Sequence, residues 1–308
     1  MSSDDCNALE TLDARLRAIL PEEYQDCYED VQPVSMGSAG LKYGSDGKVA
    51  WNEMWASFCD LAMAGGPPHK GTLLEPARRS EIEAQADRYA DVTEEICRGI
   101  AMVTDLAARE SPMPGWVRLP CFSEAMAGWL ARAIVMENVA VRCQGMAIDL
   151  PAAPHFRLEK EIKNVITVSA KTCHYWMGHI PRAQKRAIAD LFAKMAEESP
   201  LVEPAVSSDD DGRADSHQIA SARMGEAIQQ HTGLTPSSHR YAGWLGVECP
   251  SVRAAIWMMR ALVVSNVLSR REGTTLFVPV NPARDPQGEA VVGSLTRIHG
   301  FAAARGML

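Results

Sequence analysis

The sequence contains an internal repeat, and this repeat constrains the fold more than any other feature does. Residues 115–151 align without a gap on residues 243–279, an offset of 128 residues, and 14 of the 37 aligned positions are identical. The segment LLEPA at 73–77 recurs as LVEPA at 201–205 with the same offset. Self-similarity of this kind is typical of a duplicated structural unit. The sequence therefore predicts two similar units, and we expect them to be related by a pseudo-twofold axis.

Hydrophobic periodicity predicts the elements of each copy. A central helix of about 20 residues is expected between two short strands, and β-branched runs further on predict a third strand in each unit. The expected fold class is α/β, or helix-rich α+β, with two β-α-β-β units and extra helices. The predicted strands are 116–119, 146–150 and 164–169 in the first copy, and 244–247, 274–278 and 291–295 in the second.

The segments outside the repeat predict a helix over 7–20, turns or a short hairpin over 34–50, and a helix that begins at Trp51. The expected domain organisation follows from these elements. It consists of an N-terminal helical arm with a turn-rich segment at 1–44, a first repeat unit at 45–172 and a second repeat unit at 173–308.

Composition excludes several classes of function. A net charge of -8 and a pI near 5.5 oppose nonspecific binding to nucleic acid or to an anionic membrane. Arg132 and Arg260 interrupt the two most apolar stretches, and the acidic start MSSDDCNALE is not typical of a secretory signal. Eight cysteines are spaced singly with no CxxC pair, which predicts reduced thiols in the cytoplasm. Assembly of identical chains is left open.

Two cysteines recur at the start of the central helices. Cys121 and Cys249 each stand two residues before a serine that is the natural N-cap, so each thiol is expected beside the positive end of a helix. Such a position lowers a thiol pKa and favours nucleophilic or acid–base chemistry, provided that the sulfur is exposed. The alternative is a small buried residue where a strand meets a helix.

Cationic residues recur inside and after the same helices. Asn138 with Arg142, and Asn266 with Arg270, stand four residues apart, which would place each pair on one helix face. An amide and a guanidinium can hold a carboxylate or phosphate, although a cation at a helix C-terminus also offsets the macrodipole. The arginines within the helices, Arg132 and Arg260, need an anion, either an acidic side chain or a bound substrate.

Two polar segments are not repeated. The loop GGPPHKGT at 65–72 carries His69, Lys70 and Thr72, which are acid–base or anion-binding groups, but it lacks Walker A spacing and fits an ordinary connector as well. Within the segment 159–181, five titratable side chains lie close together in the sequence at the end of the expected strand. Their density suggests a cleft, with aromatic packing as the alternative. These groups are Lys171, Cys173, His174, Tyr175 and His179.

The sequence thus favours a cytosolic enzyme that acts on a small anionic metabolite at the interface of the two units. His174, His69 or the thiols of Cys121 and Cys249 would supply acid–base chemistry. Two alternatives stay open: a noncatalytic ligand-binding or assembly protein, and a metal-binding protein that uses His174, His179 and a cysteine. No cofactor is indicated, and neither nucleic acid nor a membrane is an expected partner. The expected anion-binding residues are Lys70, Thr72, Lys171, Asn138, Arg142, Asn266 and Arg270.

Overall fold

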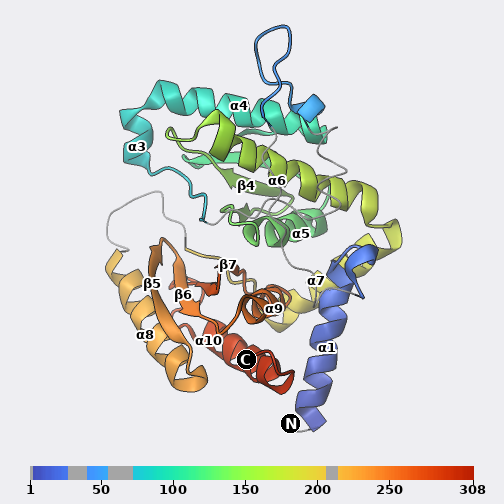
Figure 1. Cartoon of the computed structure of the whole chain (residues 1–308), viewed down its shortest axis with the longest axis vertical. Coiled ribbons are helices and arrows are strands. Elements are labelled where there is room, and N and C mark those ends of the chain that lie inside the picture. Colours follow the sequence, from blue (N-terminus) through green and yellow to red (C-terminus); the bar gives the residue numbers. More distant parts are fainter. Residues whose placement is uncertain (1–2, 27–39, 55–71, 206–213) are drawn as a thin grey trace. The chain divides into compact units, whose positions relative to one another are not determined.

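A computed structural model describes residues 3–26, 40–54, 72–205 and 214–308 of the chain (Figure 1). The chain divides into two compact units. One unit comprises residues 33–181, and the other comprises residues 1–32 together with 182–308. The N-terminal helix therefore belongs to the same unit as the C-terminal part of the chain.

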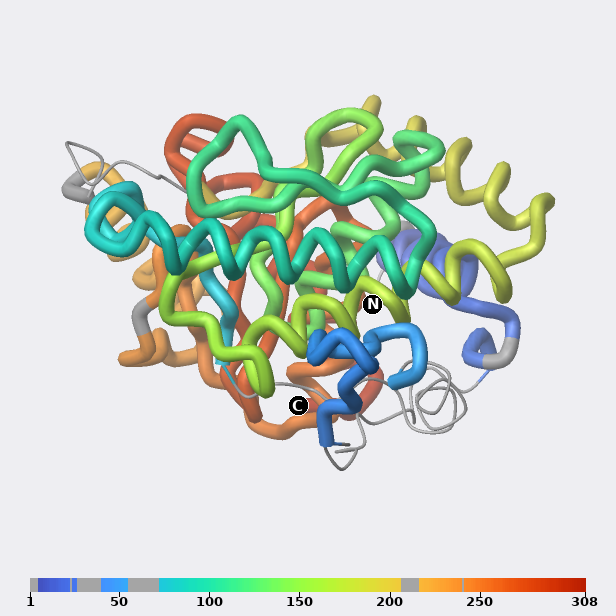
Figure 2. The backbone as a smooth tube through the Cα atoms, turned by 90° about the horizontal axis from the view of Figure 1, so that it is seen from above, coloured from blue at the N-terminus to red at the C-terminus, as the bar shows by residue number. Residues whose placement is uncertain are grey.

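The unit of residues 33–181 contains a four-stranded antiparallel sheet in the order β1-β2-β4-β3. Helix α4 packs on β1 and β2, α5 packs on β3 and β4, and α6 packs against both helices. Figure 2 shows α4 and α6 running next to each other. The elements are α3 (Arg79–Ala84), α4 (Ala86–Thr104), β1 (Arg109–Glu110), β2 (Trp116–Pro120), α5 (Glu124–Val135), β3 (Arg142–Cys143), β4 (Ala147–Pro151), the π-helical turn η2 (Leu158–Ile162), α6 (Lys163–His174) and the π-helical turn η3 (Tyr175–His179).

The other unit contains a second four-stranded antiparallel sheet, in the equivalent order β5-β6-β8-β7. Helix α9 packs on β7 and β8, and α8 packs on β5 and β6, while α10 packs against α8 and α9. The elements are α1 (Ser3–Ile19), a short 3-10 helix η1 (Glu22–Tyr24), α7 (Arg182–Glu198), α8 (Ala214–Thr232), β5 (Thr235–Tyr241), β6 (Trp244–Glu248), α9 (Val252–Val263), β7 (Arg270–Glu272), β8 (Thr275–Pro279) and α10 (Glu289–Ala304).

The 128-residue offset of the sequence recurs in the strand registers. Trp116 pairs with Pro151, and Trp244 pairs with Pro279 in the other sheet. The LLEPA and LVEPA segments make equivalent parallel bridges, Leu74 with Val139 and Val202 with Val267. Helices α4 and α8 also begin and end 128 residues apart. The same contacts are therefore built twice from matching positions.

Two recurring glycines lie against the LLEPA and LVEPA segments. Gly115 has φ +86°, and a Cβ at this position would lie 2.5 Å from the Ala77 carbonyl oxygen. Gly243 has φ +76°, and its Cβ would lie 2.7 Å from the Ala205 carbonyl oxygen. Only glycine combines a positive φ with so close an approach of two backbone segments.

Because every strand pair within the two sheets is antiparallel, the fold belongs to the α+β class, and the α/β alternative is wrong. The first two predicted strands of each unit are confirmed, with β4 and β8 shifted by one residue. The predicted third strands, 164–169 and 291–295, are wrong, since these residues lie within α6 and α10. Their β-branched residues pack in a helical interior, where tertiary contacts outweigh intrinsic propensity.

The central helices are shorter than predicted, with 12 residues in each of α5 and α9. Asn138 and Asn266 both have φ +59°, a left-handed conformation that ends the helical segment before them. Arg142 and Arg270 therefore lie on strands β3 and β7. The expectation that each Asn and Arg share one helix face is wrong.

The N-terminal predictions are met where the structure describes them. The helix expected at 7–20 forms most of α1, and residues 40–50 form turns with a bridge between Tyr43 and Val49. Helical structure begins at Trp51, and the remainder of that predicted helix lies outside the described residues. Within the described ranges, no helix is both long and apolar enough to cross a membrane.

Candidate functional site

The most concentrated group of titratable side chains lies at the C-terminal end of α6. The predicted strand here is a helix, which changes into the π-helical turn η3, and the Ile180 N–H donates to the Tyr175 carbonyl over 3.0 Å. A π-helical turn is closed by hydrogen bonds between residues five apart, which brings such residues close together. His174 and His179 accordingly meet, with 3.0 Å between their Nε2 atoms.

Burial shifts the acid–base behaviour of this cluster. Burial, followed by repulsion from His179, lowers the pKa of His174 below its ordinary value. Lys171 is 8% exposed, and burial lowers its pKa to about 8, against the opposing effect of the Glu137 carboxylate. Its Nζ lies 5.5 Å from the centre of the Tyr175 ring. Near neutral pH, His174 is therefore mostly neutral and Lys171 mostly charged.

Aromatic packing holds the end of α6 against α5. The rings of Trp129 and Trp176 are 5.7 Å apart. Arg132 lies one turn after Trp129 on α5, is 5% exposed, and donates to the Gly128 carbonyl over 2.9 Å. A packed scaffold of this kind limits the rotation of the η3 side chains, which favours a defined geometry for the histidine pair.

The two repeated cysteines lie where the sequence places them but are buried. The Ser123 hydroxyl accepts from the Met126 N–H, and Ser251 accepts from Ala254, both over 3.1 Å, so the predicted N-caps are confirmed. Cys121 and Cys249 are only 7% and 6% exposed. Burial raises the pKa of each thiol to about 12. Burial thus favours the packing alternative for both thiols.

The repeated asparagines hold backbone in place. The Asn266 amide donates to the carbonyls of Met195 and Ser199 at the end of α7, over 2.8 Å and 2.7 Å. The Asn138 and Asn266 carbonyls accept from the N–H groups of Leu74 and Val202, each over 2.8 Å. Both side chains are buried, Asn138 completely. These contacts favour a structural role over substrate binding.

Arg270 is fully buried in the second sheet. Its guanidinium donates to Glu272 over 2.6 Å and stacks on the rings of Phe277, Tyr241 and Trp244, with 4.0 Å to the Phe277 ring centre. A side chain with no exposed surface cannot meet an anion that arrives from solvent. The structure therefore gives Arg270 a packing role.

The equivalent residue Arg142 has a different environment, and it leads to two residues that the sequence analysis missed. Its Nη1 lies 3.9 Å from the carboxylate of Asp149 on β4. Asp149 is fully buried and accepts two hydrogen bonds from Arg118 on β2, over 2.8 Å and 2.9 Å. The signal in the sequence was a single charged residue at the centre of each of two short apolar strands.

The remaining predicted residues belong to the 65–72 loop. His69 and Lys70 lie outside the described residues, and Thr72 is exposed.

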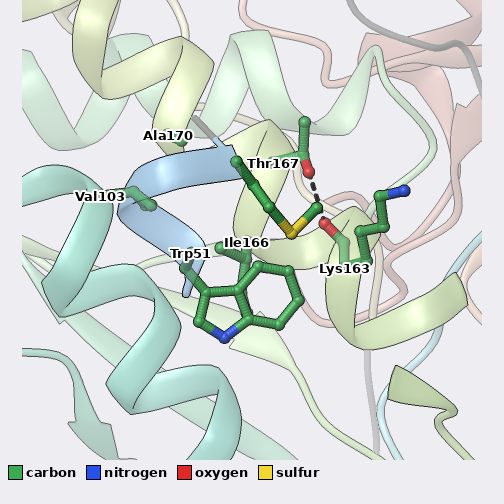
Figure 3. A pocket seen from close by; sticks show the side chains of 7 residues that line it. Trp51, Val103, Lys163, Ile166, Thr167 and Ala170 are labelled. Atoms are coloured by element: carbon green, nitrogen blue, oxygen red, sulfur yellow. Dashed lines mark hydrogen bonds between the residues drawn. The ribbon is translucent and has the colours of Figure 1, made fainter. Parts of the chain in front are cut away.

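A small cavity lies between the start of the Trp51 helical segment, α4 and α6 (Figure 3). Its volume of about 20 Å³ is comparable to the space of one water molecule and is too small for a metabolite. In Figure 3 the Lys163 ammonium points away from the Trp51 indole, and the Thr167 hydroxyl donates to the Lys163 carbonyl over 2.7 Å. None of the predicted site residues lines it. Its lining residues are Trp51, Met54, Val103, Lys163, Ile166, Thr167 and Ala170.

Among the residues that the structure describes, no group of three or more His, Cys, Asp or Glu side chains is arranged to hold a metal ion. The best-defined chemical arrangement is thus the pair of imidazoles at the end of α6, with the buried lysine one turn earlier. No family model, no curated protein and no solved structure matches this chain.

Proposed function

We propose that this protein performs acid–base chemistry on a small anionic metabolite, with His174 and Lys171 as the functional groups. The observation that carries the proposal is the 3.0 Å contact between the Nε2 atoms of His174 and His179, with buried Lys171 on the preceding turn. Residues three apart on a helix lie on the same side. One helix end therefore presents a base and a cation together.

The two groups have complementary roles in this proposal. His174, whose pKa is lowered by burial and by His179, is neutral near pH 7 and accepts a proton from the substrate. The Lys171 ammonium, whose pKa burial lowers to about 8, attracts the anion and can return a proton. The imidazole of His179 selects the tautomer of His174 through their shared hydrogen bond.

Proton abstraction can be tested before the substrate is known. The protein is incubated in deuterated buffer with a panel of small carboxylates and phosphate esters, and NMR follows deuterium incorporation at carbon. We expect exchange or turnover of one class of compound, and its loss in His174→Gln. The matched control is His155→Gln, because His155 is exposed in the same unit. Full activity of His174→Gln would contradict the assignment.

A noncatalytic ligand-binding or assembly protein is the second candidate. The burial of Arg270 and the backbone contacts of Asn266 support it, because the most strongly repeated polar residues serve packing. This candidate predicts saturable binding of a compound from the same panel without any deuterium exchange. Exchange that depends on His174 would exclude it.

A metal-binding protein is the third candidate. With metal–nitrogen distances of about 2.0–2.1 Å, two neighbouring ligands of one ion lie roughly 3 Å apart or slightly more, which is compatible with the histidine pair. The purified protein should then contain a stoichiometric transition metal that His174→Ala removes. Elemental analysis without such a metal argues against this candidate.

We also infer that the chain arose by internal duplication, which the repeated registers and bridges support. A pseudo-twofold relation between the copies is part of this hypothesis. A cytoplasmic location is proposed because none of the cysteines that the structure describes forms a disulfide bond, and fractionation of cells tests it. These cysteines are Cys6, Cys97, Cys121, Cys143, Cys173 and Cys249.

A further inference from the structure

One face of the first sheet carries a row of charged residues, with one residue on each strand. Arg109 on β1 lies opposite Arg118 on β2, which lies opposite Asp149 on β4, which lies opposite Arg142 on β3. The alternate residues of β2 and β4 are fully buried and form the face that α4 and α5 cover; they are Val117, Leu119, Ile148 and Leu150. The charged row therefore occupies the opposite face of the sheet.

The row has an excess of positive charge. Three guanidinium groups share one carboxylate, so the row carries about two positive charges in a chain whose net charge is -8. Like charges directly opposite on neighbouring strands are unfavourable, and this applies to Arg109 and Arg118. The bidentate bond to Asp149 offsets only one of the three charges. A bound carboxylate would offset one of the two remaining charges, and a bound phosphate would offset most of both.

The second sheet lacks this row. The 128-residue offset places Gly246, Phe277 and Arg270 at the positions of Arg118, Asp149 and Arg142. Phe277 and Arg270 are fully buried and stack on each other. In the first sheet, by contrast, the side chains of Arg118 and Arg142 are 23% and 21% exposed. The first sheet thus carries a partly exposed charged row where the second carries a buried stack of Arg270 on aromatic rings.

We propose that the row of Arg109, Arg118 and Arg142 binds the carboxylate or phosphate group of a small molecule. Guanidinium groups bind such oxyanions through paired hydrogen bonds, and the buried Asp149 holds Arg118 in a fixed orientation. The guanidinium of Arg142 lies 5.6 Å from the Trp116 ring, which also limits its movement. Two of the three cations are therefore positioned before any ligand binds.

This site is distinct from the proposed acid–base centre. Lys171 and His174 lie on α6, which packs on α4 and α5, whereas the arginine row lies on the sheet face that these two helices do not cover. The two groups of residues therefore lie on opposite sides of the sheet. The oxyanion site stands independently of the proposed catalytic function.

The test measures binding of inorganic phosphate and of acetate by calorimetry and thermal shift, with chloride at the same ionic strength as the reference. We expect saturable binding of one or both, and the comparison of the two probes distinguishes phosphate from carboxylate recognition. Arg142→Gln and Arg109→Gln should each weaken binding about tenfold or more, since a charge-assisted interaction is lost. Arg142→Gln leaves the bond between Arg118 and Asp149 intact, so the variant should fold, which circular dichroism verifies.

The matched control is Arg297→Gln, an exposed arginine on α10 of the other unit. This control should bind as the unaltered protein does. The proposal is overturned if neither phosphate nor acetate binds, or if all three variants bind equally well. A loss of the same size in Arg297→Gln would mean that general charge attraction, and no defined site, explains the binding.

Discussion

Replacement of Gly115 by alanine tests the close backbone approach on which each repeat unit depends. The added Cβ would lie 2.5 Å from the Ala77 carbonyl oxygen and 3.2 Å from Pro76 Cβ. Gly115 has φ +86°, and the left-handed conformation costs an L-residue about 1–2 kcal/mol. Relief of the clash would move residue 77 away from residue 115.

This movement threatens two backbone hydrogen bonds, from Ala77 N–H to Ala152 and from Ala152 N–H to Gly115, of 3.0 Å and 2.8 Å. Each contributes about 1 kcal/mol, so the total loss expected for Gly115→Ala is about 3–4 kcal/mol. Gly145→Ala is the control, because Gly145 has φ +61° and no atom within 4 Å of the added Cβ. Gly145→Ala carries the same conformational cost without the clash and the loss of hydrogen bonds, so we expect a loss of about 1–2 kcal/mol.

The difference of about 2 kcal/mol corresponds to a Tm difference on the order of 4–8 °C for a domain of this size. Urea unfolding followed by circular dichroism, together with calorimetry, measures it. If both variants lose the same free energy of unfolding, the positive φ alone explains the need for glycine at position 115, and the argument from the close backbone approach is refuted. A milder effect for Gly115→Ala would refute it more strongly.

Three further predictions concern the thiols, the helix caps and the buried lysine. Burial raises the thiol pKa of Cys121 and Cys249 to about 12, so both should be alkylated far more slowly at pH 7.5 than the exposed Cys6. Peptide mass spectrometry measures the rates, and rapid modification of Cys121 would contradict its burial. Ser123→Ala and Ser251→Ala should each lower the free energy of unfolding by about 1 kcal/mol, because each removes an N-cap hydrogen bond. Ser123→Asp should keep most of the stability of the unaltered protein, since aspartate is also a good N-cap. Chemical denaturation measures these values, and an alanine variant as stable as the unaltered protein would contradict the prediction. Burial lowers the pKa of Lys171 from its ordinary 10.5 to about 8 in the folded protein. Between about pH 8 and pH 10.5 the unfolded chain therefore binds more protons than the folded protein, and the free energy of unfolding should rise with pH. Lys171→Met should remove this contribution, and an unchanged pH dependence of unfolding in the variant would show that Lys171 is not its source.

Local patterns explain which parts of the fold could be predicted. The serine caps and the Trp116 and Trp244 strands depend on neighbours within a few residues, and the repeat displays each of them twice. The apolar, β-branched residues of 164–169 predict a strand, yet this run lies in α6 with most of its side chains buried. A helix buried on several sides loses the amphipathic period by which sequence methods recognise it.

The sequence predicts which residues belong to the candidate site, but it does not predict how their side chains are arranged. The density of titratable groups predicts Lys171 and His174 as site residues, but the contact between His174 and His179 depends on a π-helical turn that no local pattern indicates. Arg118 and Asp149 were missed because they stand 31 residues apart and meet only through strand pairing. A charged residue in an apolar strand is a useful signal for such pairs.

The sequence alone determined that similar elements recur at an offset of 128 residues, because short-range periodicity and turn chemistry are encoded by neighbouring residues. It also determined the residue types available for chemistry. Tertiary structure decided which of them can use that chemistry. Burial raised the pKa of the Cys121 and Cys249 thiols, sealed Arg270 among aromatic rings and left Arg142 partly exposed beside Asp149. Desolvation and long-range pairing control these outcomes, and both depend on residues that are distant in the chain.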